Sequence, residues 1–323
     1  MSSPAASQRN TERPSSITII YLATLAVTVL VALVLPANLF GIRRLAQSSW
    51  AAIDLRGRPL SSVAGIERTS SQNIHQSSVV NGIKMRTPVY FLSHGGPNIM
   101  YDVEHPAYKE LGKIGKEITT KVKPRAVVVF SAHWQAGVDT VQVNTAEKTE
   151  LIYDHYYKEK YPNVGSSEIA NSVLDALKQA GIKAEGVKRG LDHGVWHYRL
   201  GEAVSKLREE NILIIVSGMA VHNLRDFRFT FNDARPLPYT VSFDEALKDA
   251  ATKPPAERPQ ALVDLLKRGD ARQAHPYFDH LLPIHVGAGA AGEDRGKRLW
   301  TLKEGSTSWA QYRFGEVANA SAL

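Results

Sequence analysis

Residues 211–218 read NILIIVSG, a short apolar run that is bounded by an asparagine and a glycine. A run of this length that is rich in β-branched residues is typical of a strand buried on both faces of a sheet. Similar runs are PVYFL at 88–92 and RAVVVF at 125–130, and IKAEGV at 182–187 is a weaker candidate. These runs predict the strands of a buried central sheet.

Segments with the spacing of amphipathic helices separate these strands. They are 106–122, 166–180 and 198–210. The second of them begins at a pair of serines that can cap a helix, and Gly181 follows its end. Alternating strands and helices predict an α/β fold with a mostly parallel central sheet that is flanked by helices.

The N-terminal region contains an uncharged apolar run, ITIIYLATLAVTVLVALVL, at residues 17–35. A helix of this length spans about 30 Å, which matches the hydrocarbon core of a bilayer. The apolar region of a secretory signal peptide is shorter, roughly 7–15 residues. We therefore predict an N-terminal tail (1–16) and one transmembrane helix (17–40) that anchors the protein to the membrane. A cleaved targeting peptide is the alternative.

The distribution of basic residues indicates an orientation for this anchor. More arginines follow the apolar run than precede it, which predicts a cytosolic location for the rest of the protein. Residues 41–85 are rich in serine, glycine and arginine without a sustained period, and we interpret them as a flexible linker. The main domain is then expected to cover residues 86–323.

Composition excludes several classes of function. The chain of 323 residues has a formal net charge of +7, of which +5 lies in residues 1–85, so the remaining 238 residues carry only +2. Such a nearly neutral domain argues against nucleic acid as a partner. The chain has no cysteine, which excludes disulfides, thiolate zinc sites and cysteine nucleophiles.

Histidines follow several of the predicted strands. His94, His133 and His222 come after the strands at 88–92, 125–130 and 211–218, respectively. The carboxyl ends of parallel strands share one edge of a sheet, where ligands bind, so these three imidazoles can converge. His193, in the loop after 182–187, would reach the same edge. A single strand-end histidine is usually a hydrogen-bonding loop residue, but four together favour a metal or acid–base site with nitrogen and oxygen ligands.

We interpret six further histidines in three ways. His280 lies in an apolar segment that could pack against the site, whereas His275 is interpreted as a capping or turn residue. A structural or surface role fits His75, His105, His155 and His197 better.

Several motifs together resemble a known family. They are SHGGP (93–97), SAHW (131–134), LDHGVW (191–196), SGMAVHNL (217–224) and HLLPIHVGAGAAG (280–292). In this order they resemble the class III extradiol ring-cleavage dioxygenases of the LigB superfamily, in particular the 4,5-DOPA dioxygenase extradiol-like branch. The resemblance covers the chain from about residue 88 to its C-terminus and leaves the predicted anchor and linker outside.

The resemblance implies a metal-dependent enzyme that opens the ring of a catechol such as DOPA with O2. It implies a mononuclear non-haem Fe(II) site, with Zn(II) in some relatives, held by His94, His133 and His280. His222 matches the acid–base histidine, and His193 matches a second active-site histidine that helps to hold substrate or oxygen. An imidazole is suited to removing a catechol proton at neutral pH.

The chain departs from this family at two places. In relatives, some tens of residues that include a strand follow the match to Trp196, whereas here His197 follows directly. An aromatic Tyr-Gly-Phe-Pro segment of relatives is missing after Asp154. We interpret both as internal deletions, through skipped exons or a misdrawn gene model. They predict a retained ligand set with a compromised fold and activity.

Two other functions stay open. The protein could be a non-catalytic metal-binding or interaction protein on the same fold. A zinc hydrolase is the third possibility, since three histidines at a strand edge would also activate water.

Overall fold

The computed structural model describes residues 79–80, 83–84, 86–133, 139–148, 164–188, 198–231 and 233–317. The predicted tail and transmembrane helix therefore lie outside the described residues. Within the described part of the chain, no helix is both long and apolar enough to cross a membrane. Two short antiparallel strands, β1 (Val79–Val80) and β2 (Ile83–Lys84), fall inside the range that was predicted to be a linker.

The central sheet has five strands. Their spatial order is β4 (Ala126–Ser131), β7 (Ile212–Gly218), β3 (Val89–Ser93), β12 (Gln311–Phe314) and β9 (Gly296–Trp300). The strands predicted at 88–92, 125–130 and 211–218 are confirmed, and they form its parallel half.

The expectation of a mostly parallel sheet holds for the direction of the strands, since four of the five run the same way, but not for their pairing: β12 runs against the others and pairs antiparallel with both β3 and β9. The connection between β9 and β12 is too short for the crossover that parallel strands need. Both strands also carry basic residues, in GKRLW and QYRF, so neither forms an apolar run that marks a strand in the sequence.

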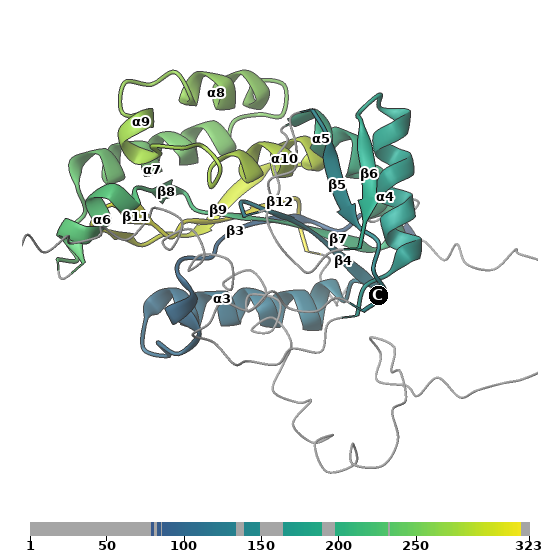
Figure 1. The fold of residues 1–323 in the computed structure, drawn as a ribbon, viewed down its shortest axis with the longest axis horizontal. Coiled ribbons are helices and arrows are strands. Elements are labelled where there is room, and N and C mark those ends of the chain that lie inside the picture. Colours follow the sequence, from purple (N-terminus) through teal and green to yellow (C-terminus); the bar gives the residue numbers. More distant parts are fainter. Residues whose placement is uncertain are drawn as a thin grey trace, which may run out of the picture.

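Helices cover both faces of the central sheet (Figure 1). One face packs against α3 (Pro106–Glu117), and the other packs against α10 (Leu282–Ala291) and its neighbours. The side chains of β3 alternate between these two faces. Tyr90 and Leu92 join the hydrophobic cluster on the α3 side, whereas Val89 and Phe91 join the cluster that contains α10. The fold is therefore α/β with the sheet buried between two layers of helices.

The predicted helices are present with small changes at their ends. The helix predicted at 106–122 is α3 followed by a π-helical turn, η4 (Ile118–Val122). The helix predicted at 166–180 is α4 (Ser167–Gln179), which Ser166 caps through its side chain. The helix predicted at 198–210 is α5 (Tyr198–Val204) followed by the 3-10 helix η5 (Ser205–Glu210).

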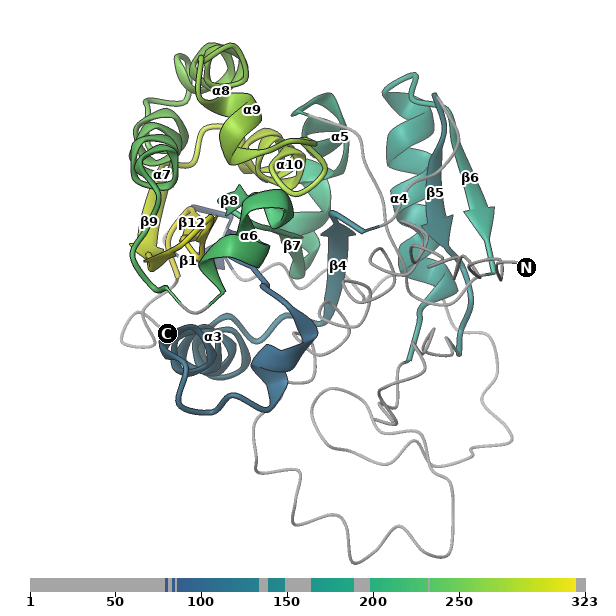
Figure 2. The same cartoon turned by 60° about the vertical axis from the view of Figure 1, so that its left-hand side comes forward.

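Two smaller sheets accompany the central one. β5 (Val141–Asn144) and β6 (Ala184–Val187) form a parallel pair beside α4, apart from β4 (Figure 2). The strand expected at 182–187 is thus present as β6, but among the described residues it pairs only with β5. β8 (Val221–His222), β11 (Thr307–Ser308) and β10 (Lys303–Glu304) form a third sheet.

The remaining helices are short or lie at the periphery. They are η3 (Pro97–Met100), α6 (Leu224–Thr230), α7 (Pro238–Ala251), α8 (Arg258–Leu265) and α9 (Ala271–Ala274).

The backbones of α5 and α10 touch at two glycines. A Cβ atom at Gly289 would lie 2.0 Å from the carbonyl oxygen of Tyr198, and one at Gly201 would lie 1.9 Å from that of Val286. Only glycine permits such an approach, because any larger residue would push the two helices apart. The position of α10, and of the segment that leads into it, therefore depends on this contact.

Two buried arginines satisfy the carbonyl groups at the end of α10. Arg208 donates hydrogen bonds to Ala290 and Ala291, and Arg258 donates to Gly292. The last carbonyls of a helix have no partner within the helix and carry partial negative charge. Arg208 also pairs with Asp294, which offsets the cost of burying its charge.

The contact between α5 and α10 can be tested with a pair of glycine variants. Gly289→Ala should lower the free energy of unfolding by about 1–3 kcal/mol, because the methyl group overlaps a carbonyl group. Gly112→Ala is the matched control: Gly112 also lies in a helix but has open space around it, so alanine should stabilise by about 0.5–1 kcal/mol. Urea unfolding measures both, and equal effects would contradict the proposed contact.

Candidate metal centre

Two histidines reach the carboxyl edge of the parallel strands directly from β3 and β4. His94 follows the last residue of β3, and its backbone N–H donates to the carbonyl of Gly218 at 3.0 Å. His133 lies two residues beyond β4, and the N–H of Ala132 donates to the carbonyl of Ser217 at 2.9 Å. Both loops are therefore tied to the end of β7, as expected for neighbouring parallel strands.

His280 comes from a different part of the fold, the segment just before α10. Its carbonyl accepts a hydrogen bond from the N–H of Met219 at 2.9 Å. A Cβ atom at Gly218 would lie only 2.1 Å from the same carbonyl oxygen. The glycine that ends β7 thus leaves the space in which this segment approaches the sheet.

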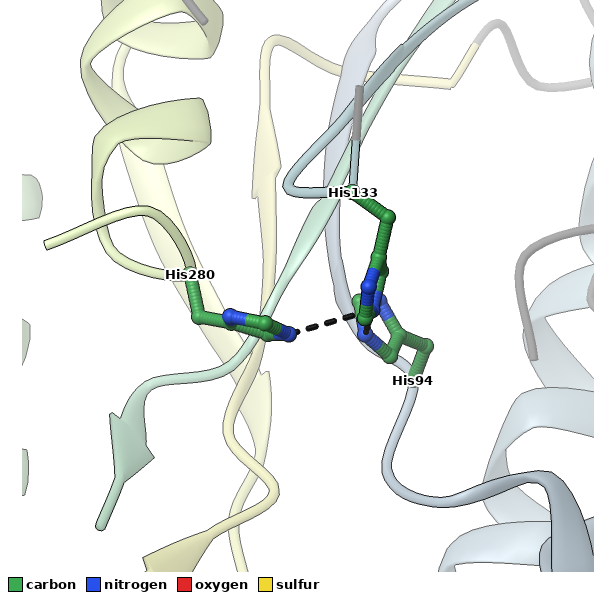
Figure 3. Close-up of side chains that lie close together, drawn as sticks. All are labelled: His94, His133 and His280. Carbon is green, nitrogen blue, oxygen red and sulfur yellow. Dashed lines mark hydrogen bonds between the residues drawn. The ribbon is translucent and has the colours of Figure 1, made fainter. Parts of the chain in front are cut away.

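The three imidazoles converge in a buried cluster (Figure 3). The Nε2 atom of His133 lies 2.8 Å from that of His94 and 3.1 Å from that of His280. The exposed fractions of the three residues are only 1%, 3% and 4% for His94, His133 and His280. Three ring nitrogens that face one another in a buried space provide a candidate set of metal ligands.

The spacing of these nitrogens fits one metal ion. Metal–imidazole bonds are about 2.1 Å long, so two nitrogens bound at right angles to one ion lie about 3 Å apart. The outer nitrogens have their own partners: Nδ1 of His94 lies 2.9 Å from the Ser217 hydroxyl, and Nδ1 of His280 lies 3.0 Å from the Asp279 carboxylate. Such outer partners orient the Nε2 atoms of metal-binding histidines.

Burial keeps His133 uncharged at neutral pH. Burial, and after it repulsion from a protonated His222, lowers the pKa of His133 to about 3, although the Asp279 carboxylate opposes both effects. A neutral imidazole has a lone pair that can bind a metal ion, whereas an imidazolium does not. His133 is therefore in the protonation state that a ligand needs.

His222 lies beside the cluster. Its ring stacks on that of His280 with a centroid distance of 3.8 Å and an angle of 16°. It belongs to β8, whose pairing with β11 places Thr307 opposite His222. Burial lowers its pKa to about 4, against the opposing effect of Asp279. His222 is thus a neutral imidazole at pH 7 that can accept a proton close to the candidate ligands.

The structure places two of the other predicted histidines, His105 and His275, away from the cluster. His105 caps α3 by accepting a hydrogen bond from the N–H of Ala107, and buried His275 ends α9 and lies 2.9 Å from the carbonyl of Ala220. Both thus have structural contacts. His193, His75, His155 and His197 lie outside the described residues, as do the junctions after Asp154 and Trp196.

Sequence reasoning did not identify Ser217 and Asp279 as partners of the candidate ligands. Ser217 is a polar residue within the buried run of β7, and Asp279 directly precedes His280. Ser217 could have been found from its hydroxyl group in an otherwise apolar strand, because a buried polar group needs a hydrogen-bond partner. For Asp279, the only signal was that it directly precedes His280 in the sequence.

Comparisons with known proteins agree with this geometry. A family model described as the catalytic LigB subunit of aromatic ring-opening dioxygenase matches residues 87–197. A 4,5-DOPA dioxygenase extradiol from Beta vulgaris is 32% identical and covers 70% of this chain and 95% of its own. One from Escherichia coli K12 is 28% identical over 64% of this chain. The crystal structure of an uncharacterised E. coli K12 protein matches with a TM-score of 0.56 and 27% identity, over 71% of this chain and all of its own.

The alignment with the Beta vulgaris protein is longer than the part of this chain that it covers. It runs over 267 residues, whereas 70% of the 323 residues of this chain is about 226, so about 40 aligned positions have no counterpart here. The family match ends at residue 197, next to the junction after Trp196.

The cluster predicts different effects for two histidine substitutions. His133→Ala should abolish tight binding of Zn(II) or Co(II), because it removes one of three ligands from a buried site. His222→Ala should retain binding, because the His222 ring stacks on a ligand without joining the three nitrogens. Calorimetric titration of each variant measures this. Loss of binding in His222→Ala together with normal binding in His133→Ala would contradict the assignment.

Proposed function

Because the chain belongs to the LigB superfamily of aromatic ring-opening dioxygenases, in its 4,5-DOPA dioxygenase extradiol-like branch, we propose that it is an extradiol dioxygenase that opens the ring of a DOPA-like catechol with O2. The observation that carries this proposal is the buried cluster of His94, His133 and His280 with the imidazole of His222 stacked against it. The cluster combines a metal-binding set with a neighbouring proton acceptor.

The donor set fits Fe(II), with Zn(II) as the alternative metal. His94, His133 and His280 would hold the ion through their Nε2 atoms. When bound, Fe(II) supplies the redox chemistry that the reaction of a catechol with O2 needs, whereas Zn(II) has none. All three ligands are neutral, and the Asp279 carboxylate behind His280 is the negative group that balances part of the charge of the ion.

We assign the acid–base role to His222. Its pKa of about 4 keeps the ring neutral at pH 7, so that it can take the proton of a catechol hydroxyl group. The stacking on His280 holds the ring next to the three candidate ligands. His193, which lies outside the described residues, is proposed to help hold substrate or oxygen.

Reconstitution with metal tests the proposed activity. Protein loaded with Fe(II) under anaerobic conditions and then given DOPA and O2 should consume O2 and form a yellow semialdehyde, whereas Zn(II)-loaded protein should do neither. His222→Ala loaded with Fe(II) should keep the metal and lose turnover, because the proton acceptor is absent.

The other outcomes identify the alternative functions. Tight Fe(II) binding without O2 uptake for any catechol would favour a non-catalytic metal-binding or interaction protein on this fold. Hydrolysis of an ester substrate by the Zn(II)-loaded protein would favour a zinc hydrolase.

We further propose that missing segments after Asp154 and Trp196 compromise the fold and the activity. The alignment with the Beta vulgaris relative supports this proposal. About 40 of the 267 aligned positions have no residue of this chain opposite them. The sheets also fit the loss of a strand: among the described residues, β4 is an edge strand of the central sheet, and β5 and β6 form a separate pair. Exposed strand edges are a liability for stability and solubility.

A protein with both segments restored tests this second proposal. The restored protein should melt at a higher temperature and turn over catechol faster than the present chain, because the sheet and the pocket wall are complete. Calorimetry and O2 uptake under identical Fe(II) loading provide the comparison. Equal melting temperatures and equal turnover would contradict the proposal.

We propose that residues 17–40 anchor the protein in a membrane, with the catalytic domain (86–323) in the cytosol. The support is the uncharged apolar run at 17–35 and the excess of arginines after it. A cleaved targeting peptide is the alternative, and the N-terminal sequence of the mature protein, together with resistance of the protein to alkaline extraction from membranes, decides between them.

A further inference from the structure

The C-terminal segment from β10 to β12 contacts the candidate centre at two places, although it carries none of the predicted site residues. Thr307 of β11 pairs with His222 of β8. The side chain of Gln311 bonds both backbone groups of Ser93, with its Oε1 accepting from the N–H at 3.0 Å and its Nε2 donating to the carbonyl at 3.0 Å. The residue after Ser93 is the candidate ligand His94.

Trp309, in the same segment, packs against the loop that carries His94. Its six-membered ring occupies the place that a side chain of Gly95 would take, since a Cβ atom there would lie 1.8 Å from the ring. Gly95 has a φ of +66°, which favours glycine and gives the loop little intrinsic preference for this conformation. On another side, the N–H of Gly95 lies 3.0 Å from the sulfur of Met219. The loop is therefore held by its neighbours rather than by its own sequence.

A hydrogen-bond network fixes the indole of Trp309. Its Nε1–H donates to the Glu304 carboxylate at 3.0 Å, and Nε2 of His105 lies 3.1 Å from the same oxygen. Nδ1 of His105 accepts from the N–H of Ala107, so Nε2 carries the proton and donates to Glu304. The His105 ring also contacts the indole, with a centroid distance of 4.8 Å.

We propose that Trp309 is a positioning residue for His94 and that Glu304 holds Trp309 in place. This proposal deepens the proposed function and rests on it, since it concerns the same metal centre. A ligand must be held within a fraction of an ångström to bind a metal tightly, and loss of the residues that orient it weakens binding. Without the indole, Gly95 would have no side chain packed against it on this side, and the loop could move together with His94.

The test compares two tryptophan variants of the full chain. Trp309→Ala should weaken Zn(II) binding about 10–100-fold and speed hydrogen exchange of residues 93–96 in the metal-free protein. Trp300→Ala is the matched control. Trp300 packs against the hydrophobic cluster to which Trp309 belongs, but the atoms nearest to the Cβ position of Gly95 are all from Trp309. It should leave Zn(II) affinity and the exchange of residues 93–96 close to those of the wild type.

Glu304→Gln provides a variant with little risk of unfolding, since Glu304 lies near the surface with 29% of its side chain exposed. The amide has one acceptor oxygen without a charge, so the indole is held less firmly, and Zn(II) affinity should fall between those of wild type and Trp309→Ala. If Trp309→Ala does not fold, the Glu304→Gln variant decides: wild-type affinity and wild-type exchange of residues 93–96 would overturn the proposal.

Equal effects of Trp309→Ala and Trp300→Ala would also overturn it, because they would indicate a general loss of packing. These outcomes are distinct from failure of the proposed function. Zn(II) binding without ring cleavage by the Fe(II)-loaded wild type would refute the function and leave the positioning role intact. If the wild type binds no metal, hydrogen exchange of residues 93–96 alone decides whether Trp309 holds the loop.

Discussion

The backbone contact between Gly218 and His280 connects the sheet to the helical layer and thereby creates the candidate site. The carbonyl of Gly218 accepts from the N–H of His94, and the absence of a side chain at Gly218 leaves room for the carbonyl of His280. The backbones of two of the three candidate ligands, His94 and His280, thus meet at one residue at the end of β7. Any larger residue there would push the segment before α10 away from the sheet and separate the ligands.

The helical side of this contact is equally constrained. The approach of α10 to α5 needs Gly201 and Gly289, and the end of α10 needs the guanidinium groups of Arg208 and Arg258. A glycine-rich helix has a low intrinsic propensity, so tertiary contacts supply most of its stability. The same contacts set where α10 begins and therefore where His280 lies. The stability of this layer and the geometry of the candidate centre cannot be changed independently.

The charge of the candidate centre follows from its burial. Burial lowers the pKa values of both His133 and His222, so these two imidazoles are neutral at pH 7. Asp279 opposes both shifts and contacts His280, so this one carboxylate acts on three histidines of the centre. A site built in this way favours a bound cation over protons on its own ligands, which suits a metal centre next to a histidine that exchanges protons.

The sequence by itself determined the parallel half of the sheet and the placement of His94 and His133 at its carboxyl edge, because apolar runs mark buried strands and the carboxyl ends of parallel strands share an edge. His222, which was expected to converge with them, stacks on His280 and does not join the three nitrogens. The role of His280 as a ligand was predicted only from its position in an apolar segment and from the family resemblance. Tertiary structure alone decided the antiparallel pairing of β12, the separation of β6 from the central sheet, and the contacts of Gly218, Asp279 and Trp309. The physical reason is distance along the chain: Trp309 meets Gly95 across more than two hundred residues, and no local period or propensity encodes such a contact.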